Sequence, residues 1–194
     1  MFKNMRSQKA QTTYYSRLNE YFPAVEMKHP LHLESLLESE PYYHKQETDD
    51  YLLLYARFPK FVFVDYLLVS GTTRGSGVGS RVIRGLQKDG RPILLEVEKV
   101  SDDDPDTAAR RRFYKRHGFH QVEGLRYQRK DDDGNPFKMD ILAWAPGHPV
   151  TADQAYRWMQ EVCRTVHNHK AVEFYDALPA DPEKVLAIVA GQQA

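Results

Sequence analysis

Apolar positions recur along the chain at two spacings, and the spacing separates expected helices from expected strands. Some stretches repeat an apolar residue every three or four positions, as an amphipathic helix does, whereas others are rich in aromatic and β-branched residues, as strands are. The pattern predicts helices over residues 11–22, 31–38, 107–117 and 152–167, a further one between Gly79 and Gly90, and a second C-terminal helix over residues 182–190. It predicts strands over residues 51–57, 61–69, 93–100, 119–127 and 138–144.

The middle of the chain predicts a sheet that contains parallel strands. Residues 51–57 and 61–69 flank Pro59 and are expected to form a hairpin, and the second of these strands is apolar on both faces, as a central strand is. A glycine-rich turn, a helix and the strand 93–100 follow, an order that describes a right-handed crossover between parallel strands. The acidic loop 102–104 then precedes the next helix and is expected to cap it. We therefore expect an α/β (α+β) fold with a mixed central sheet.

Residues 146–149 have the composition of a linker between two parts of the chain. The first part, residues 1–145, holds all the expected strands, whereas residues 146–194 are expected to form a C-terminal helical extension. This extension has no glycine loop and no acidic constellation. We expect it to pack on the first part or to provide the contact of a homodimer.

Composition excludes several classes of protein. Lys plus Arg and Asp plus Glu both total 27, so the net charge is zero and no nucleic-acid partner is expected. No apolar run reaches membrane-spanning length, and a single cysteine suits a reducing cytoplasm; Cys163 is expected to be buried as a small apolar residue. No metal site is expected either, because the histidines lack carboxylate or cysteine partners at ligand spacing. Surface positions are expected for His117, His120, His167 and His169.

Glycines cluster where the expected central strand meets the next helix. The sequence there is Arg74-Gly75-Ser76-Gly77-Val78-Gly79, and glycine lets a backbone turn tightly and approach a ligand. The first amide groups of the helix lack partners and lie at the positive end of its dipole, so a pyrophosphate is the expected guest. No lysine follows Gly79, which excludes a P-loop, and the G-x-G-x-G spacing differs from the dinucleotide fingerprint.

Two motifs together resemble those of the GCN5-related N-acetyltransferase (GNAT) family. Arg74, Gly77 and Gly79 match the family's R/Q-x-x-G-x-G/A motif, and residues 113–119 are similar to its F-Y-x-x-x-G-F signature. The resemblance spans about residues 51–144. It implies a sheet that splays between its two parallel strands, with the thioester of acyl-CoA, expected to be acetyl-CoA, in the gap.

The resemblance also implies which residues hold this co-substrate. The amides of pantetheine would extend the central strand by pairing with its backbone near Leu68 and Val69. Thr107 stands where the family often has an asparagine and is expected to hydrogen-bond pantetheine. The residues expected to bind acyl-CoA are Leu68, Val69, Arg74, Gly75, Ser76, Gly77, Val78, Gly79, Ser80, Thr107 and Phe113.

An amine must lose a proton before it attacks a thioester, so a carboxylate is expected near the gap. Glu96 and Glu98 share one face of an otherwise apolar strand. The resemblance to ribosomal-protein N-acetyltransferases implies that Glu96 is the base, with Glu98 and then Asp65 as alternatives. Salt bridges to the arginines at 110–112 are the structural alternative for both glutamates. Tyr114 matches the family tyrosine that protonates the departing thiolate or hydrogen-bonds its sulfur.

Two functions are compatible with these motifs. The first is an acyl-CoA-dependent N-acyltransferase, in which a primary amine of a small molecule or a protein attacks acetyl-CoA directly in a ternary complex. Direct attack is expected because no cysteine is placed to carry the acyl group. The alternative is an acyl-CoA-binding module that keeps the fold without the chemistry and acts as a sensor or a partner-binding domain.

Overall fold

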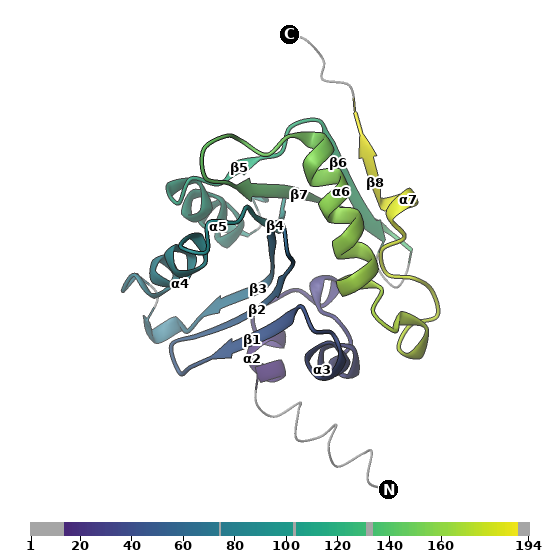
Figure 1. The fold of residues 1–194 in the computed structure, drawn as a ribbon. Coiled ribbons are helices and arrows are strands. Elements are labelled where there is room, and N and C mark those ends of the chain that lie inside the picture. Colours follow the sequence, from purple (N-terminus) through teal and green to yellow (C-terminus); the bar gives the residue numbers. More distant parts are fainter. Residues whose placement is uncertain (1–13, 74, 103, 131–133, 190–194) are drawn as a thin grey trace, which may run out of the picture.

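One mixed sheet forms the centre of the molecule. The computed structural model describes residues 14–73, 75–102, 104–130 and 134–189. The strands follow the order β1-β2-β3-β4-β7-β6-β8, with β5 beside β7 (Figure 1). They are β1 (Tyr43–Glu47), β2 (Tyr51–Arg57), β3 (Val62–Val69), β4 (Ile93–Glu98), β5 (His120–Gln121), β6 (Leu125–Lys130), β7 (Pro136–Trp144) and β8 (Leu186–Ile188). The neighbours β3 and β4 run parallel, which confirms the expected crossover.

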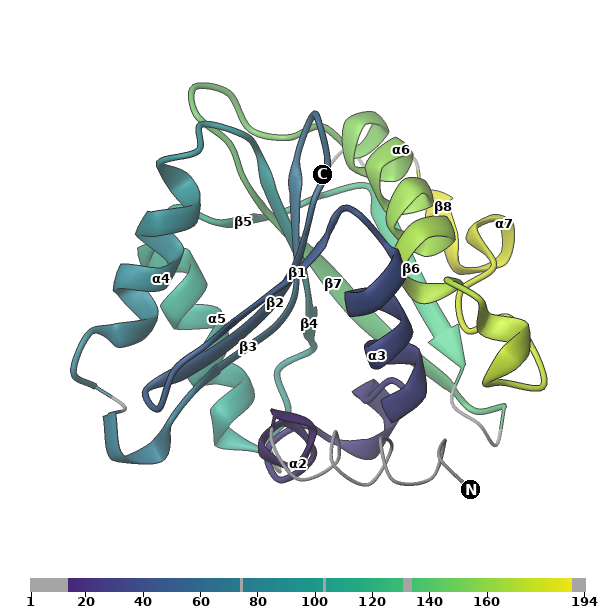
Figure 2. The ribbon, with the colours of Figure 1, turned by 60° about the horizontal axis from the view of Figure 1, so that its bottom comes forward.

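Helices cover both faces of this sheet. In Figure 2, α4 and α5 lie on one side of the strands, and α3 and α6 lie on the other. Two clusters of buried apolar side chains fill the two sides. The α-helices are α2 (Ser16–Asn19), α3 (Pro30–Ser39), α4 (Val78–Gln87), α5 (Pro105–Arg116), α6 (Ala152–Val162) and α7 (Pro182–Val185). Shorter turns are η2 (Ala24–Glu26), η3 (Gly71–Thr73), the π-helical η4 (Cys163–His167) and η5 (Ala171–Glu173).

The parallel strands β3 and β4 stay paired over a short length only. Their ladder runs from Val62 opposite Ile93 to Val64 opposite Leu95 and ends there. Both strands continue beyond this point, β3 against β2 and β4 against β7. The facing edges of β3 and β4 therefore separate, which confirms the splay that the family resemblance implies.

Helix α5 begins at Pro105, earlier than the expected Thr107, and ends next to Gly118 as its sequence predicts. Asp104 is the N-cap, and its side chain accepts a hydrogen bond from the amide of Asp106 at 2.9 Å. Gly118 follows the helix with a φ of +79°, a conformation that glycine adopts without the strain of a Cβ. The expectation that the acidic loop caps this helix is confirmed for Asp104.

The apolar pattern misjudged three strands. β1 is a polar edge strand with a single buried residue, so it carries little apolar signal. The strand expected over residues 119–127 is divided into β5 and β6, with Gly124 at a φ of +79° between them. The helix expected over residues 182–190 is wrong beyond Val185, because α7 gives way to β8, which pairs with β6. The C-terminal part is therefore not purely helical.

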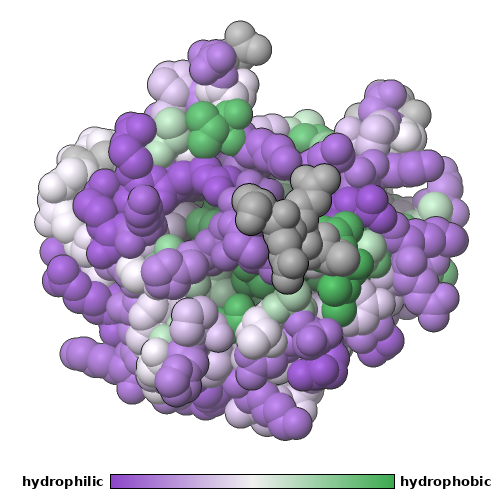
Figure 3. Space-filling view, turned by 90° about the horizontal axis from the view of Figure 1, so that it is seen from above, coloured by the Kyte–Doolittle hydropathy of each residue, from purple (hydrophilic) through white to green (hydrophobic). Residues whose placement is uncertain are grey.

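The C-terminal part shares the larger of the two cores. Ala155 and Met159 of α6 are fully buried in the same cluster as Leu33 of α3 and Phe63 of β3. Most of the face seen in Figure 3 is hydrophilic, and apolar side chains gather in small patches on it. No helix among the described residues has the length and apolar character needed to cross a bilayer. The homodimer stays a prediction.

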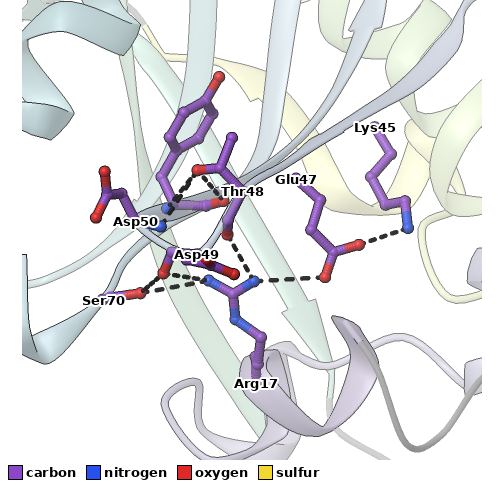
Figure 4. A network of polar contacts seen from close by, with 8 residues as sticks. Arg17, Lys45, Glu47, Thr48, Asp49, Asp50 and Ser70 are labelled. Carbon is purple, nitrogen blue, oxygen red and sulfur yellow. Dashed lines mark hydrogen bonds and ion pairs between the residues drawn. The ribbon is translucent and has the colours of Figure 1, made fainter.

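Helix α2 is fastened to the sheet through one arginine. Arg17 Nη1 donates to the carbonyl oxygen of Thr48 at 2.9 Å and lies 3.4 Å from Glu47 Oε1, both at the end of β1 (Figure 4). Its Nη2 lies 3.4 Å from Ser70 Oγ, immediately after β3. These contacts hold α2 close to the ends of β1 and β3.

Candidate functional site

A cavity of about 430 Å³ lies where β3 and β4 part. Its wall is built from both faces of the sheet, with α4 and α5 on one side and the segment after α2 on the other. The lining residues are Tyr21, Phe22, Glu26, Lys28, Val64, Asp65, Tyr66, Leu67, Val69, Thr73, Gly75, Gly77, Val78, Gly79, Ser80, Leu95, Glu96, Asp106, Ala109, Arg110, Phe113, Tyr114, Arg116, Arg129 and Met139. The cavity thus passes between the strands and connects the two faces.

The end of the cavity at α4 has the geometry of an anion site. Gly77 is the N-cap of α4, with a φ of +83° and no side-chain cap among the described residues. The first-turn amides of an α-helix have no partners within the helix, so these N–H groups can bind an anion. A Cβ on Gly79 would lie 3.2 Å from Phe113 Cζ and 3.3 Å from Val69 Cγ2, so glycine lets α4 pack this closely without displacing either side chain.

The structure brings together most of the residues expected to bind acyl-CoA. Those that line the cavity are Val69, Gly75, Gly77, Val78, Gly79, Ser80 and Phe113. Leu68 and Ser76 do not line it, and Arg74 falls outside the described residues. Thr107 is buried away from the lining, and its hydroxyl donates to the carbonyl oxygen of Asp104 at 2.6 Å. Thr107 therefore belongs to the turn that begins α5.

Tyr114 enters the cavity wall from α5. Its side chain is buried, and its ring makes edge contacts with Phe113 and Phe119. Burial raises the pKa of the Tyr114 phenol to about 12, so the hydroxyl keeps its proton near neutral pH. A protonated phenol at this place can donate a hydrogen bond or a proton into the cavity.

Glu96 reaches the cavity from β4 and is bound to the C-terminal part of the chain. Its Oε1 lies 2.8 Å from Nε2 of His167, whose side chain is 1% exposed. Burial opposes the charge of Glu96, but His167, Arg129 and Lys28 outweigh it and lower the pKa of this carboxyl to about 2. Burial lowers the pKa of His167, although the Glu96 carboxylate opposes this shift. Because a carboxylate only accepts, Nε2 of His167 is the donor of this hydrogen bond. The expectation that His167 lies on the surface is wrong.

A second carboxylate pair lies beside Arg110. Glu98 forms an ion pair with Arg110, which is the structural alternative that the sequence left open. Glu26 of η2 lines the cavity, and Glu98 is the acidic group that affects its pKa most. Burial and the neighbouring Glu98 carboxylate raise the pKa of Glu26 to about 8, and Arg110 opposes this shift only in part. Glu26 therefore keeps its proton to a higher pH than an ordinary carboxyl group.

Asp65 is held by two partners on the same face. Lys28 Nζ lies 2.6 Å from its Oδ1, and the Tyr43 hydroxyl donates to its Oδ2 at 2.5 Å. The side chains of Lys28 and Asp65 are each 5% exposed. Both oxygens of Asp65 are therefore engaged by protein partners.

Sequence reasoning missed several charged groups at the cavity: Glu26, Lys28, Arg129 and His167. The first two lie between expected helices, in a segment without periodicity. A signal for His167 was present, because it follows Met159 and Cys163 at four-residue spacing on the buried face of the last long helix. Cys163 itself is fully buried, as expected.

Comparison with known proteins agrees with this geometry. No family model matches the chain. The protein YjbC of Bacillus subtilis (strain 168), named as a candidate acetyltransferase, is 39% identical over 178 residues, which cover 91% of this chain and 92% of YjbC.

Solved structures share the fold. A GNAT-family protein of Bacteroides thetaiotaomicron, described as a candidate acetyltransferase, superposes with a TM-score of 0.65 at 23% identity and covers 86% of this chain and 94% of its own. Arabidopsis thaliana Naa50, solved with the bisubstrate analogue CoA-Ac-MVNAL, gives a TM-score of 0.52 at 16% identity, with 71% and 93% coverage. With the identity to YjbC extending over nearly the whole of both proteins, the chain belongs to the GNAT family of acyl-CoA-dependent N-acyltransferases.

Proposed function

We propose that this protein transfers the acetyl group of acetyl-CoA to a primary amine by direct attack in a ternary complex. The observation that carries the proposal is the cavity between β3 and β4, which has an uncapped helix N-terminus at one side of the sheet and a set of carboxyl groups at the other. Such a cavity lets the two substrates meet from opposite faces. The amine belongs to a small molecule or a protein, and a reducing cytoplasm suits the single free cysteine.

The residues present fit acetyl-CoA as the donor. The first-turn amides of α4 would bind its pyrophosphate, and the edge of β3 beyond Val64 would pair with the amides of pantetheine. Phe113 and Gly79 shape the wall between these two places. When bound, acetyl-CoA supplies the activated acetyl thioester, and Naa50 of Arabidopsis, solved with a CoA-containing bisubstrate analogue, has a related fold.

Two side chains would handle the protons of the reaction. Tyr114 would protonate the departing thiolate or hydrogen-bond its sulfur. Glu26 would take the proton of the amine, because a pKa of about 8 suits proton transfer near neutral pH. Glu96, which the family resemblance favours, has a pKa of about 2 and is the weaker base. We therefore give Glu96 the role of holding the acceptor end of the cavity in place with His167.

Direct transfer agrees with the position of Cys163. This thiol is fully buried on the C-terminal helix, and burial raises its pKa to about 12. It does not line the cavity. An acyl-enzyme on cysteine therefore finds no support among the described residues.

Turnover separates catalysis from the alternative of an acyl-CoA-binding module. We expect free CoA to be released from acetyl-CoA when at least one member of an amine panel is present, and acetylated amine to form in equal amount. The panel should contain small amines, amino acids and peptides with free N-termini. Binding of acetyl-CoA without release of CoA for any member would contradict the enzymatic function and favour the sensor.

The helix N-terminus is tested by Gly77→Val. A branched side chain at a φ of +83° is strained and would displace the first-turn amides, so the Kd for CoA should rise about tenfold or more. Gly85→Ala in the same helix is the matched control, because nothing lies within 4 Å of an added Cβ there. Calorimetric titration with CoA measures both variants. An unchanged Kd in a folded Gly77→Val protein would rule out this end as the pyrophosphate site.

Glu26→Gln tests the proton acceptor. With a pKa of about 8 for Glu26, kcat/KM for acetyl-CoA at saturating amine should rise with pH up to about pH 8 and then level off. The variant should lose this rise and about 100-fold of the rate. Glu96→Gln should lower the rate without moving the pH profile. The reverse result, with the rise kept in Glu26→Gln and lost in Glu96→Gln, would return the role of base to Glu96.

The pH dependence of protein stability tests the raised pKa of Glu26 without any substrate. The folded-state pKa of Glu26, about 8, lies above the ordinary 4.5, so the folded protein binds more protons between these values. The free energy of unfolding of the wild type should therefore fall as pH rises through this window. The Glu26→Gln variant should not show this fall, because a glutamine side chain cannot ionise. The unfolding free energy of Glu26→Gln relative to wild type should increase from about pH 5 to about pH 9 in urea. A difference that is constant with pH would show that the pKa is not raised.

A further inference from the structure

The guanidinium of Arg129 lines the proposed acceptor side of the cavity and has no hydrogen-bond or ion-pair partner among the described residues. Arg129 lies on β6 and forms part of the cavity wall. Its Nε is shielded from solvent and makes no hydrogen bond, and none of the described residues forms an ion pair or a hydrogen bond with this side chain. Its carbon Cζ lies 5.4 Å from the ring centre of Phe137, a contact that orients the guanidinium without using its N–H groups.

The carboxylates nearest to Arg129 are engaged elsewhere. Glu96 accepts a hydrogen bond from His167, and Asp65 is held by Lys28. Burial opposes the charge of Arg129, but the neighbouring acidic groups outweigh it and raise its pKa further above the usual value. Arg129 is thus a charged group whose N–H donors have no acceptor among the residues that the structure describes.

This arrangement calls for an anion from outside the protein. The side chain of Arg129 is only partly buried, and a cationic group that lines a cavity is stabilised there by an anion that also accepts its hydrogen bonds. The planar fork of a guanidinium matches a carboxylate, which can accept two parallel hydrogen bonds. The carboxyl groups of Glu26 and Glu96 line the same cavity, so a singly charged anion fits better than a doubly charged phosphate.

We propose that Arg129 binds a carboxylate of the acceptor, and that the acceptor is therefore an amino acid or another amine that carries a carboxylate. This proposal rests on the acetyl transfer proposed for the same cavity. In the sheet order β4-β7-β6, Arg129 is two strands away from β4, a separation of about 10 Å that its long side chain partly spans. The amine end would lie at the gap between β3 and β4, and the carboxylate end toward β6.

Matched pairs of acceptors test this assignment. The probes are glycine, β-alanine, 4-aminobutanoate and 6-aminohexanoate, each compared with its own primary amide, which has the same size without the charge. We expect wild-type kcat/KM for at least one acid to exceed that for its amide by about tenfold or more, because hydrogen bonds to charged groups are the strong ones. The chain length with the largest ratio reports the distance from the thioester to Arg129.

Variants assign the preference to this residue. Arg129→Gln should bring the acid-to-amide ratio close to one, and Arg129→Lys should keep part of it, since lysine retains the charge without the fork. Arg126→Gln is the matched control on the same strand, because Arg126 is exposed and does not line the cavity. It should keep the wild-type ratio. The Kd for CoA shows that each variant is folded, and Arg129→Lys supplies the comparison if Arg129→Gln does not fold.

Two outcomes separate this proposal from the proposed function. If wild type acetylates acids and amides equally, or if Arg129→Gln slows both equally, the carboxylate site is refuted while acetyl transfer stands. If no probe is acetylated, calorimetric titration of the same acids into the protein–CoA complex still measures whether the carboxylate site binds them. Binding that is lost in Arg129→Gln would support the carboxylate site and refute the transfer, and absence of binding would refute the carboxylate site.

Discussion

The parallel ladder between β3 and β4 stops at Val64 and Leu95, and the rest of the site depends on that early stop. Beyond it, each strand is held on its outer side by an antiparallel neighbour, so the two inner edges diverge without unfolding the sheet. Peptide groups on such edges need partners. A ligand that contains amides can provide them by pairing as an added strand. The same separation lets one cavity reach both faces of the sheet.

The two faces supply different chemistry. On the side of α4 and α5, glycines and the N-terminus of α4 form a place for a phosphate. Among the described residues, no side chain caps this N-terminus. On the other side, charged groups meet in pairs, with Lys28 against Asp65 and His167 against Glu96. Lys28 precedes α3 and His167 follows α6. Segments from both halves of the chain therefore shape the proposed acceptor side, around the central motif that we propose binds the donor.

The central motif could be predicted from the sequence, and the acceptor side largely could not. Local patterns determine the strand at 61–69, the glycine turn at Gly77 and the helix that ends before Gly118, because each depends on neighbours in the chain. The pairing of Glu96 with His167 joins residues 71 positions apart, and that of Glu26 with Glu98 depends on how η2 lies against β4. No local spacing encodes such contacts. Strand β8 escaped prediction for the same reason, since its pairing with β6 outweighs the helical start at Pro182.

A crystal structure of the protein with CoA tests the account most directly, because it shows which groups face the sulfur. The account predicts the pyrophosphate at the first turn of α4, pantetheine along β3 beyond Val64, and the sulfur beside Tyr114 in the gap between the parallel strands. It also predicts that the groups of Glu26 and Arg129 lie on the far side of the sulfur from α4. CoA bound outside this gap, or a β3–β4 ladder that closes in its presence, would contradict it.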